Sequence, residues 1–331
     1  MKKCILCSCI FIAFTATAQK ITFYDWRWMP CNESQARFVS RVEQTDSGWL
    51  RSDIYLATKK LRMEELYKDS NCQVPIGTTR SYYTNQRLQS ESHYSNGILN
   101  GPLITYHYNG MIKDSVIFVN GAPTGTLKSW HSNGYLADSV VNDTSGSAVQ
   151  VSWFDNGKPS GAGKTKYGLQ EGKWRYFHRN GNTAALEEYK AGKLLSRIYF
   201  DEEGMQVTDT SNRDRPAMFR GSDRNDRWIK YMENNLEWPP HVKLVNTDTV
   251  TVTVVATIDE KGNVTDAYVE VPFDPLFDNG VLRVIKRSPK WTPAISHNRY
   301  VKDLLIHSVN FYAKPKNERE QKSFEKWLYE K

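Results

Sequence analysis

Turn-forming residue pairs recur at a nearly constant interval through the middle of the chain. Asparagine–glycine pairs ending at Gly110, Gly134, Gly157 and Gly181, followed by Glu203-Gly204, are spaced 24, 23, 24 and 23 residues apart. A second glycine series lies between them: Gly97, Gly121, Gly146, Gly168 and Gly192. Asn-Gly favours a type I′ turn, in which both central residues have positive φ, so these pairs predict tight hairpins. Each unit should therefore contain two turns and two strands of about six to eight residues.

An aromatic column keeps the same register. Its members, spaced 24, 24, 23, 24 and 23 residues apart, are Tyr82, Tyr106, Trp130, Trp153, Phe177 and Phe200. On consecutive hairpins of an antiparallel meander, these rings are expected to stack into an apolar rib on one face. Two interpretations are open: the rings form the buried core face of the sheet, or they line an exposed groove for a partner or a glycan.

The repeated unit, an aromatic residue followed by x-x-Asn-Gly and then an aliphatic residue, resembles MORN-type repeats over about residues 50–205. We assign residues 49–207 to this array, with Trp49–Tyr67 as a diverged first unit. The resemblance implies an interaction or membrane-proximal surface. Residues 19–48 precede the array as a lead-in to which the sequence gives no role.

The N-terminus has the pattern of a secretory signal peptide. Lys2 and Lys3 precede a short apolar run of eleven residues, and Ala16-Thr17-Ala18 supplies a cleavage site before Gln19. The run is shorter than the roughly 18–20 residues needed to cross a bilayer. We therefore expect residues 1–18 to be removed from an exported, periplasmic or outer-membrane-associated protein of a Gram-negative-type bacterium; the alternative is an uncleaved anchor.

Cleavage would leave two of the five cysteines, Cys31 and Cys72. In an oxidising compartment such a pair predicts a disulfide.

The C-terminal third has the pattern of a small α+β domain. Apolar residues at helical spacing predict a helix through Trp228 and Leu236, which Trp238-Pro239-Pro240 ends. Alternation from Thr249 to Val271 predicts a hairpin, Leu276 opens a second helix, and Tyr300–Tyr312 reads as a final strand. We place a linker at 208–224 and the domain at 225–314.

This order resembles the C-terminal domain of TonB, an energy-transducing periplasmic protein, over about residues 210–315. The positions that carry the resemblance are Trp238, Pro239, Gly262, Pro289, Trp291 and Pro293. Gly221-Ser222 stands where a glycine pair is common in the family, and a long proline-rich spacer is missing. The resemblance implies peptide binding without catalysis, while these departures weaken the case for energy transfer. For the two tryptophans, core packing and direct contact with a partner both remain open.

Strand addition is the binding mode that the resemblance implies. The last strand should lie at a sheet edge, where unpaired backbone groups can accept another chain. The expected edge residues are Tyr300, Val301, Asp303, Leu305, His307, Val309 and Phe311. The implied partner is an envelope protein, such as a TonB-dependent outer-membrane transporter, and a homodimer through this domain is a further interpretation.

The charged tail 315–331 carries Phe324, Trp327 and Leu328 at helical spacing, which predicts an amphipathic helix. Docking on the protein itself is favoured over membrane insertion, so any membrane association is expected to be indirect.

Two motifs resemble functional sites, a phosphate loop and a metal site, but their residues do not fit either one. Gly161-Ala162-Gly163-Lys164-Thr165 resembles the end of a phosphate loop, but Lys158 occupies the place of its first glycine and no helix is expected to follow. His107, His131 and His178 share one repeat position, three residues before the turn glycine, and Phe154 interrupts the row. We interpret them as solvated residues beside turns rather than as metal ligands.

We therefore predict a mainly β protein in which a meander of hairpin repeats is followed by a TonB-like helix–hairpin–helix–strand domain. No catalytic residue, metal or cofactor is expected. The net charge of +7 is spread along the chain, and we expect no nucleic-acid partner. The leading hypothesis is an envelope protein that binds an extended peptide. The alternatives are a TonB-type transducer for outer-membrane uptake with a retained anchor, and an architectural repeat protein that binds glycan, lipid or another envelope protein.

Overall fold

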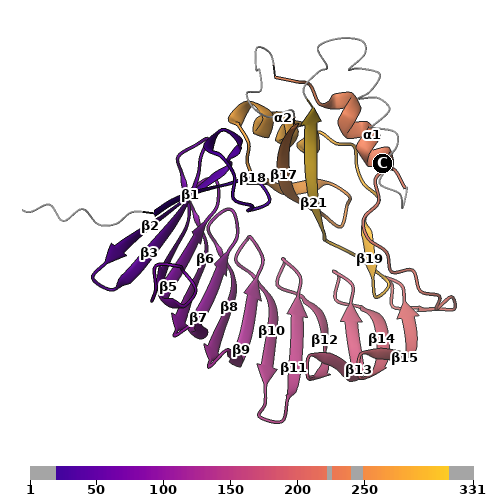
Figure 1. Cartoon of the computed structure of the whole chain (residues 1–331). Coiled ribbons are helices and arrows are strands. Elements are labelled where there is room, and N and C mark those ends of the chain that lie inside the picture. Colours follow the sequence, from indigo (N-terminus) through magenta and orange to yellow (C-terminus); the bar gives the residue numbers. More distant parts are fainter. Residues whose placement is uncertain (1–19, 222–225, 240–248, 313–331) are drawn as a thin grey trace, which may run out of the picture.

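The computed structural model describes residues 20–221, 226–239 and 249–312. It is mainly β, and most of it is one antiparallel meander in which every strand pairs with its neighbours in sequence (Figure 1). The strands of this sheet are β1 (Lys20–Tyr24), β2 (Phe38–Thr45), β3 (Gly48–Tyr55), β4 (Leu61–Tyr67), β5 (Pro75–Tyr82), β6 (Leu88–Ser95), β7 (Ile98–Tyr106), β8 (Ile112–Val119), β9 (Ala122–Trp130), β10 (Leu136–Asn142), β11 (Ser147–Trp153), β12 (Pro159–Lys166), β13 (Leu169–Phe177), β14 (Thr183–Lys190), β15 (Lys193–Phe200) and β16 (Gln206–Val207).

The Asn-Gly pairs do form hairpins, but not through the predicted type I′ turn. In the β7–β8 hairpin the Gly110 N–H donates to the His107 carbonyl (2.7 Å), and only Gly110, at φ 89°, has positive φ. This is a three-residue loop made of a type I turn and a left-handed glycine. The type I′ turns lie at the other end of the strands, as at Asn96-Gly97, where both φ values are positive.

In the Asn-Gly turns, the asparagine side chain makes hydrogen bonds to the backbone. The Asn109 amide donates to the Ser132 carbonyl of the next unit (2.6 Å), and its oxygen accepts the Met111 N–H (3.0 Å). The same link joins Asn133 to the Asp155 carbonyl, at 2.7 Å. The asparagines therefore connect successive repeats.

The aromatic column holds its register but does not form a stacked rib. Its six residues end alternate strands and are all partly exposed, and no two of their rings are in contact. Alternate strands of a sheet lie roughly 10 Å apart, beyond the 4.5–7 Å of aromatic contacts. The buried cluster of this region uses other rings: Trp174, Tyr176, Tyr189 and Tyr199. The expected apolar rib is therefore wrong.

The predicted lead-in is part of the sheet. β1 and β2 pair in register from Lys20↔Val42 to Tyr24↔Phe38, and a short 3₁₀ turn (Glu33–Gln35) lies between them. The expected boundary at residues 48 and 49 falls inside the β2–β3 hairpin. The sheet thus extends to the start of the described chain.

The predicted disulfide is wrong, because both cysteines are free. The Cys31 N–H bonds to Phe23, beside the start of β2, whereas Cys72 lies in the turn after β4. Since β2 and β4 run parallel to each other, these positions lie at opposite ends of the strands. A disulfide needs Cα atoms within about 7 Å, which this placement does not allow.

The C-terminal segment folds into two helices on one face of a three-stranded sheet. Its elements are α1 (Asp226–Asn235), β17 (Thr249–Ile258), β18 (Val264–Val271), α2 (Pro275–Lys286), β19 (Ala294–Ser296), β20 (Arg299–Val301) and β21 (Asp303–Tyr312). The sheet order is β18-β17-β21, and β19 and β20 form a separate hairpin. Phe219, expected in a linker, is 2% exposed in the core of this unit beside Trp228 and Trp291, so the approach segment belongs to the domain.

The C-terminal domain lies over the end of the array that carries the Asn-Gly turns (Figure 1). Contacts reach from Arg37, which lies over the Phe273 ring (3.9 Å), through Thr84, whose hydroxyl donates to the Val269 carbonyl (3.2 Å), to the last strands of the array. The predicted signal peptide and the amphipathic tail fall outside the described residues. Among the helices of the described ranges, none is long and apolar enough to span a membrane.

Candidate functional site

The outer side of β21 is the feature that a strand-binding function would use. β21 pairs with β17 along its whole length, from Asp303↔Ile258 to Tyr312↔Thr249, and no described strand lies beyond it. The predicted edge strand is, however, shorter than expected. Tyr300 and Val301 belong to β20 and pair with β19, and β21 begins only at Asp303, after the break at Lys302.

The side chains predicted to face a guest mostly face the protein's own core. Phe311 packs edge-on against Phe277 (4.9 Å between ring centroids), and His307 lies against Trp228 (5.6 Å). Burial lowers the pKa of His307, which favours the neutral ring. The four residues on this core side of β21 are Leu305, His307, Val309 and Phe311.

The opposite side of β21 carries the exposed set. Leu304 and Ile306 are 60% and 63% exposed, and Ser308 and Asn310 continue the same side. These side chains, which the sequence prediction did not select, would flank a strand added at this edge. The alternation along the strand was the available signal, but it did not say which side faced the helices.

The remaining motif positions support the fold of the domain. Trp291 is 8% exposed, and Trp238 packs edge-on against Phe277 (5.3 Å), so both tryptophans lie against the core. Gly262, at φ 82°, lets the β17–β18 turn approach the Trp291 backbone, whose N–H donates to the Gly262 carbonyl (2.8 Å). The Pro293 carbonyl accepts a hydrogen bond from Arg215 (2.6 Å). Pro239 borders a surface hollow beside Trp238, and Pro289 follows the end of α2.

The histidine row is a structural ladder rather than a set of solvated side chains. The Nε2 atoms of His107, His131 and His178 lie 2.7, 2.9 and 2.9 Å from the carbonyl oxygens of the next units' column residues. Because a carbonyl only accepts, each Nε2 carries the proton. His178 is buried, and no metal-binding group of three ligands occurs within the ranges that the structure describes.

Phe154 cannot donate at its place in this ladder, and the C-terminal domain supplies the missing donor. The Arg299 guanidinium bonds to the Phe177 carbonyl (3.0 Å) and to the Ser160 carbonyl, and lies 5.4 Å from the Phe154 ring. Burial lowers the pKa of Arg299 to about 10, which leaves it charged at neutral pH.

The β19–β20 hairpin carries Arg299 and fastens the domain to the array. At its tip, His297 stacks on Tyr176 (3.6 Å, 5°), and its Nδ1 lies 2.8 Å from Glu187. Burial would raise the pKa of Glu187, but hydrogen bonds from His297 and Tyr189 bring it below its usual value. Asn298 donates to the Phe200 carbonyl (2.9 Å).

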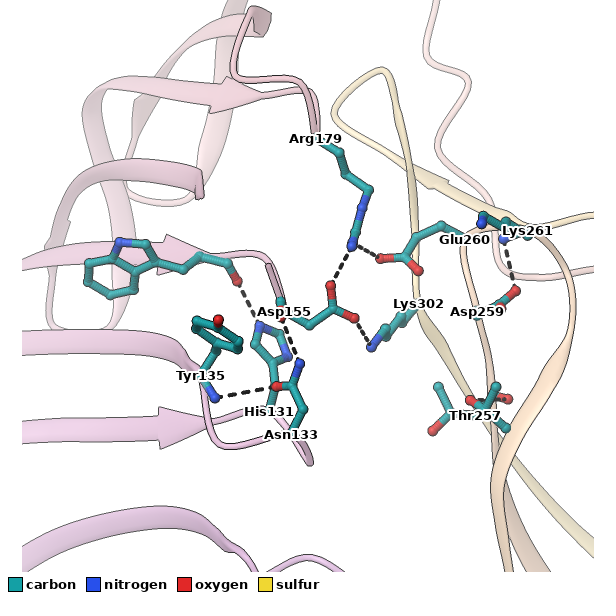
Figure 2. A network of polar contacts seen from close by, with 12 residues as sticks. His131, Asn133, Tyr135, Asp155, Arg179, Thr257, Asp259, Glu260, Lys261 and Lys302 are labelled. Carbon is teal, nitrogen blue, oxygen red and sulfur yellow. Dashed lines mark hydrogen bonds and ion pairs between the residues drawn. The ribbon is translucent and has the colours of Figure 1, made fainter. Parts of the chain in front are cut away.

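A chain of ion pairs crosses between the two halves nearby. Asp155 contacts Arg179 of the next turn and Lys302 (2.8 Å), and Arg179 also reaches Glu260 (2.8 Å), as Figure 2 shows. Burial would raise the pKa of Asp155, but the hydrogen bonds from Lys302 and Arg179 lower it to about 2. Asp155 therefore stays ionised at neutral pH.

A cleft of about 480 Å³ separates the array's turns from the sheet face that carries Leu304. The stacked rings of Tyr108 and Tyr268 (4.6 Å) border it from the two sides. No sequence pattern predicted this cleft, because its walls come from segments about 160 residues apart, as for this tyrosine pair.

Comparison with known proteins identifies one repeat. The family model of the MORN repeat variant matches residues 170–191, which span most of β13, its turn and β14. This match confirms MORN-type repeats in the array. A search of curated proteins found no significant match.

Proposed function

We propose that the chain is an exported interaction protein of the cell envelope whose C-terminal domain binds an extended polypeptide by strand addition to β21. The observation that supports this most is the position of β21: one side is fully paired, and no described strand occupies the other. The order of elements in residues 226–312 is also the order that the TonB resemblance implies.

The exposed side chains of β21 favour an extended guest. A strand added to an edge gains main-chain hydrogen bonds, and alternate side chains determine which sequences bind. Leu304 and Ile306 would contact every second residue of the guest, so we expect a preference for apolar residues there. The proposed source of such a segment is an envelope protein, for example an outer-membrane transporter.

The test is a pair of charge substitutions in the full chain. Peptides selected for binding to the protein should protect β21 amides from hydrogen exchange, and Leu304→Lys with Ile306→Lys should abolish binding, because edge lysines oppose pairing. The matched control is Ile117→Lys with Leu195→Lys, at array side chains 55% and 57% exposed. Equal loss in both variants, or binding without protection of β21, would contradict strand addition.

A second function is supported by the docked hairpin. Arg299 completes the array's own ladder, which suits an architectural protein whose C-terminal domain caps the repeats. In that case cellular localisation should depend on residues 77–205 and survive the β21 substitutions.

Energy transduction is the third candidate, and it requires that the N-terminal segment be retained as an anchor. Sequencing the mature N-terminus tests it directly. A mature chain that begins at Gln19 would exclude a transducer anchored by this segment.

A further inference from the structure

The helix-bearing face of the C-terminal domain collects basic side chains from three separate segments. Arg220 precedes α1, Arg227 and Lys230 lie on α1, and Arg283 and Arg287 lie at the end of α2. We call these five residues the basic helical face. All five are exposed. The helices α1 and α2 cover the face of the three-stranded sheet opposite to the one that borders the array's turns (Figure 1).

These cations have no close carboxylate partner in the described part of the protein. None of the five forms an ion pair with a described carboxylate, and the Arg227 guanidinium donates only to the Arg220 carbonyl (2.7 Å). By contrast, Arg51, Arg80 and Arg179 of the array all hold carboxylates. Unpaired charge on one face raises the local concentration of anions.

The cations surround hollows rather than a smooth surface. Two hollows of about 470 and 300 Å³ share Tyr231 and Asn235 as a common wall. Arg220, Arg227 and Lys230 border the first, and Arg283 and Arg287 border the second, where Glu237 is the carboxylate among the lining residues. The residues that line the two hollows therefore include five cations and one carboxylate. The exposed Asp226 and Glu233 of α1 lie outside this lining.

An exposed apolar side chain lies next to the charges. Leu276, which is 57% exposed, lines a third hollow that shares Glu237 and Arg283 with the second. A face that combines clustered Lys and Arg with a protruding aliphatic residue suits the boundary between lipid headgroups and acyl chains.

We infer that the basic helical face binds the phosphate-bearing headgroups of an anionic membrane surface. The geometry favours lipid over an acidic peptide, because α1 and α2 present helical backbone whose hydrogen-bonding groups are largely used within each helix. It also favours lipid over nucleic acid, because Tyr231 is half-buried with its hydroxyl bonded to the Val284 carbonyl (3.3 Å) and does not offer a free stacking ring. A membrane on this face would leave the array directed away from the bilayer.

The test is sedimentation of the full chain with vesicles of phosphatidylcholine alone and of phosphatidylcholine mixed with phosphatidylglycerol. We expect binding to the mixed vesicles only, weakened by added salt. Changing Arg227, Lys230, Arg283 and Arg287 to Gln should weaken it by roughly a hundredfold to a thousandfold, at about one kcal/mol per cation.

The matched control changes Lys128, Lys173, Lys190 and Lys193 to Gln, which removes the same charge from exposed positions on the array. This control should bind nearly as the parent does. Because every variant keeps residues 1–19, any contribution of that segment is common to all of them. Equal binding by the parent and the helical-face variant would overturn the inference. So would saturable binding of inorganic phosphate or an acidic peptide without vesicle binding.

Discussion

At the scale of single residues, the repeats are joined by side chains that reach from one unit to the carbonyl of the next. Tyr83, His107 and His131 occupy equivalent positions and bond to successive column residues. Tyrosine and histidine can fill the same place because each has a donor at the end of a ring. Phe154 has none, and Arg299 of the C-terminal domain takes over its partner.

Replacing this arginine should therefore destabilise the protein. Arg299→Met removes the side-chain donor to the Ser160 and Phe177 carbonyls, at a cost of about 2–5 kcal/mol in the free energy of unfolding, measured with urea. Arg299→Met combined with Phe154→His should recover about 1 kcal/mol, since histidine restores the ladder. The exposed Arg175→Met should stay within about 0.5 kcal/mol of the parent. Failure of the histidine to recover stability would contradict the ladder.

Gly262 is the second residue whose substitution should have a large effect on stability. A Cβ there would lie 1.9 Å from the Trp291 carbonyl oxygen, and φ is 82°. Gly262→Ala should therefore unfold or strongly destabilise the C-terminal domain, by more than about 3 kcal/mol in thermal or urea unfolding. The control is Gly280→Ala in α2, where nothing lies within 4 Å and alanine should stabilise by about 0.5–1 kcal/mol. A mild effect at Gly262 would show that the turn can move away from Trp291.

At the scale of elements, the first turn of α2 contains a buried acid. Asp278 accepts the Phe273 N–H (2.9 Å), and burial raises its pKa to about 7. The unfolded value is about 3.9, so between these values the folded state binds the extra proton. Stability should therefore fall as pH rises from about 4 to about 7, by at most about 4 kcal/mol, and stay level above that range.

Asp278→Asn tests this dependence, because the amide oxygen can still accept the Phe273 N–H without ionising. Urea unfolding followed from pH 4 to 8 should show a flatter curve for the variant, which should exceed the parent in stability at pH 8. Asp155 does not contribute to the change in stability over this range, since its pKa of about 2 affects stability only at lower pH. Parallel curves for the two proteins would show that Asp278 stays ionised throughout the range.

Individual strands and hairpins were the part of the fold that the sequence predicted best. The repeat interval identified the hairpins, because turns at a fixed spacing determine where each strand of a meander begins and ends. The turn type was missed, because Asn109 uses its side chain between units, which a single hairpin does not reveal. The column was misjudged for a similar reason: equal register does not bring Trp130 and Trp153 close when another strand lies between them.

At the scale of the whole molecule, ion pairs and the β19–β20 hairpin hold the two halves together. Asp155 is shared by Arg179 and Lys302, so Asp155→Ala removes two pairs at once. These groups are partly exposed, and the loss should be only about 1–2 kcal/mol at low salt. In calorimetry we expect one unfolding transition for the parent and a broadened or divided transition for this variant. Asp209→Ala, which removes the exposed pair with Arg213 within one segment, should leave its shape unchanged. Identical traces for both variants would show that the halves do not depend on this cluster.

Contacts between segments that are far apart in the chain could not be predicted from the sequence. The contact of His297 with Glu187 joins residues 110 positions apart, and neither has a neighbouring motif that points to the other. The charge of the basic helical face was likewise hidden, since Arg220, Lys230 and Arg287 are dispersed along the chain and become neighbours only when α1 packs against α2. The composition gives the net charge of the chain but not its distribution over the folded surface.

The simultaneous contacts of the C-terminal domain with Arg37, Thr84 and Phe200 give the array a defined length between Arg37 and Phe200. A free-standing meander could gain or lose one hairpin unit and remain soundly folded. Here, a unit inserted or deleted between Arg37 and Phe200 would shift at least one of these contacts by two strand spacings, roughly 10 Å, and the domain could then no longer keep all of them. Duplication and loss of repeats, the usual way in which such arrays change size, should therefore be tolerated only outside this interval.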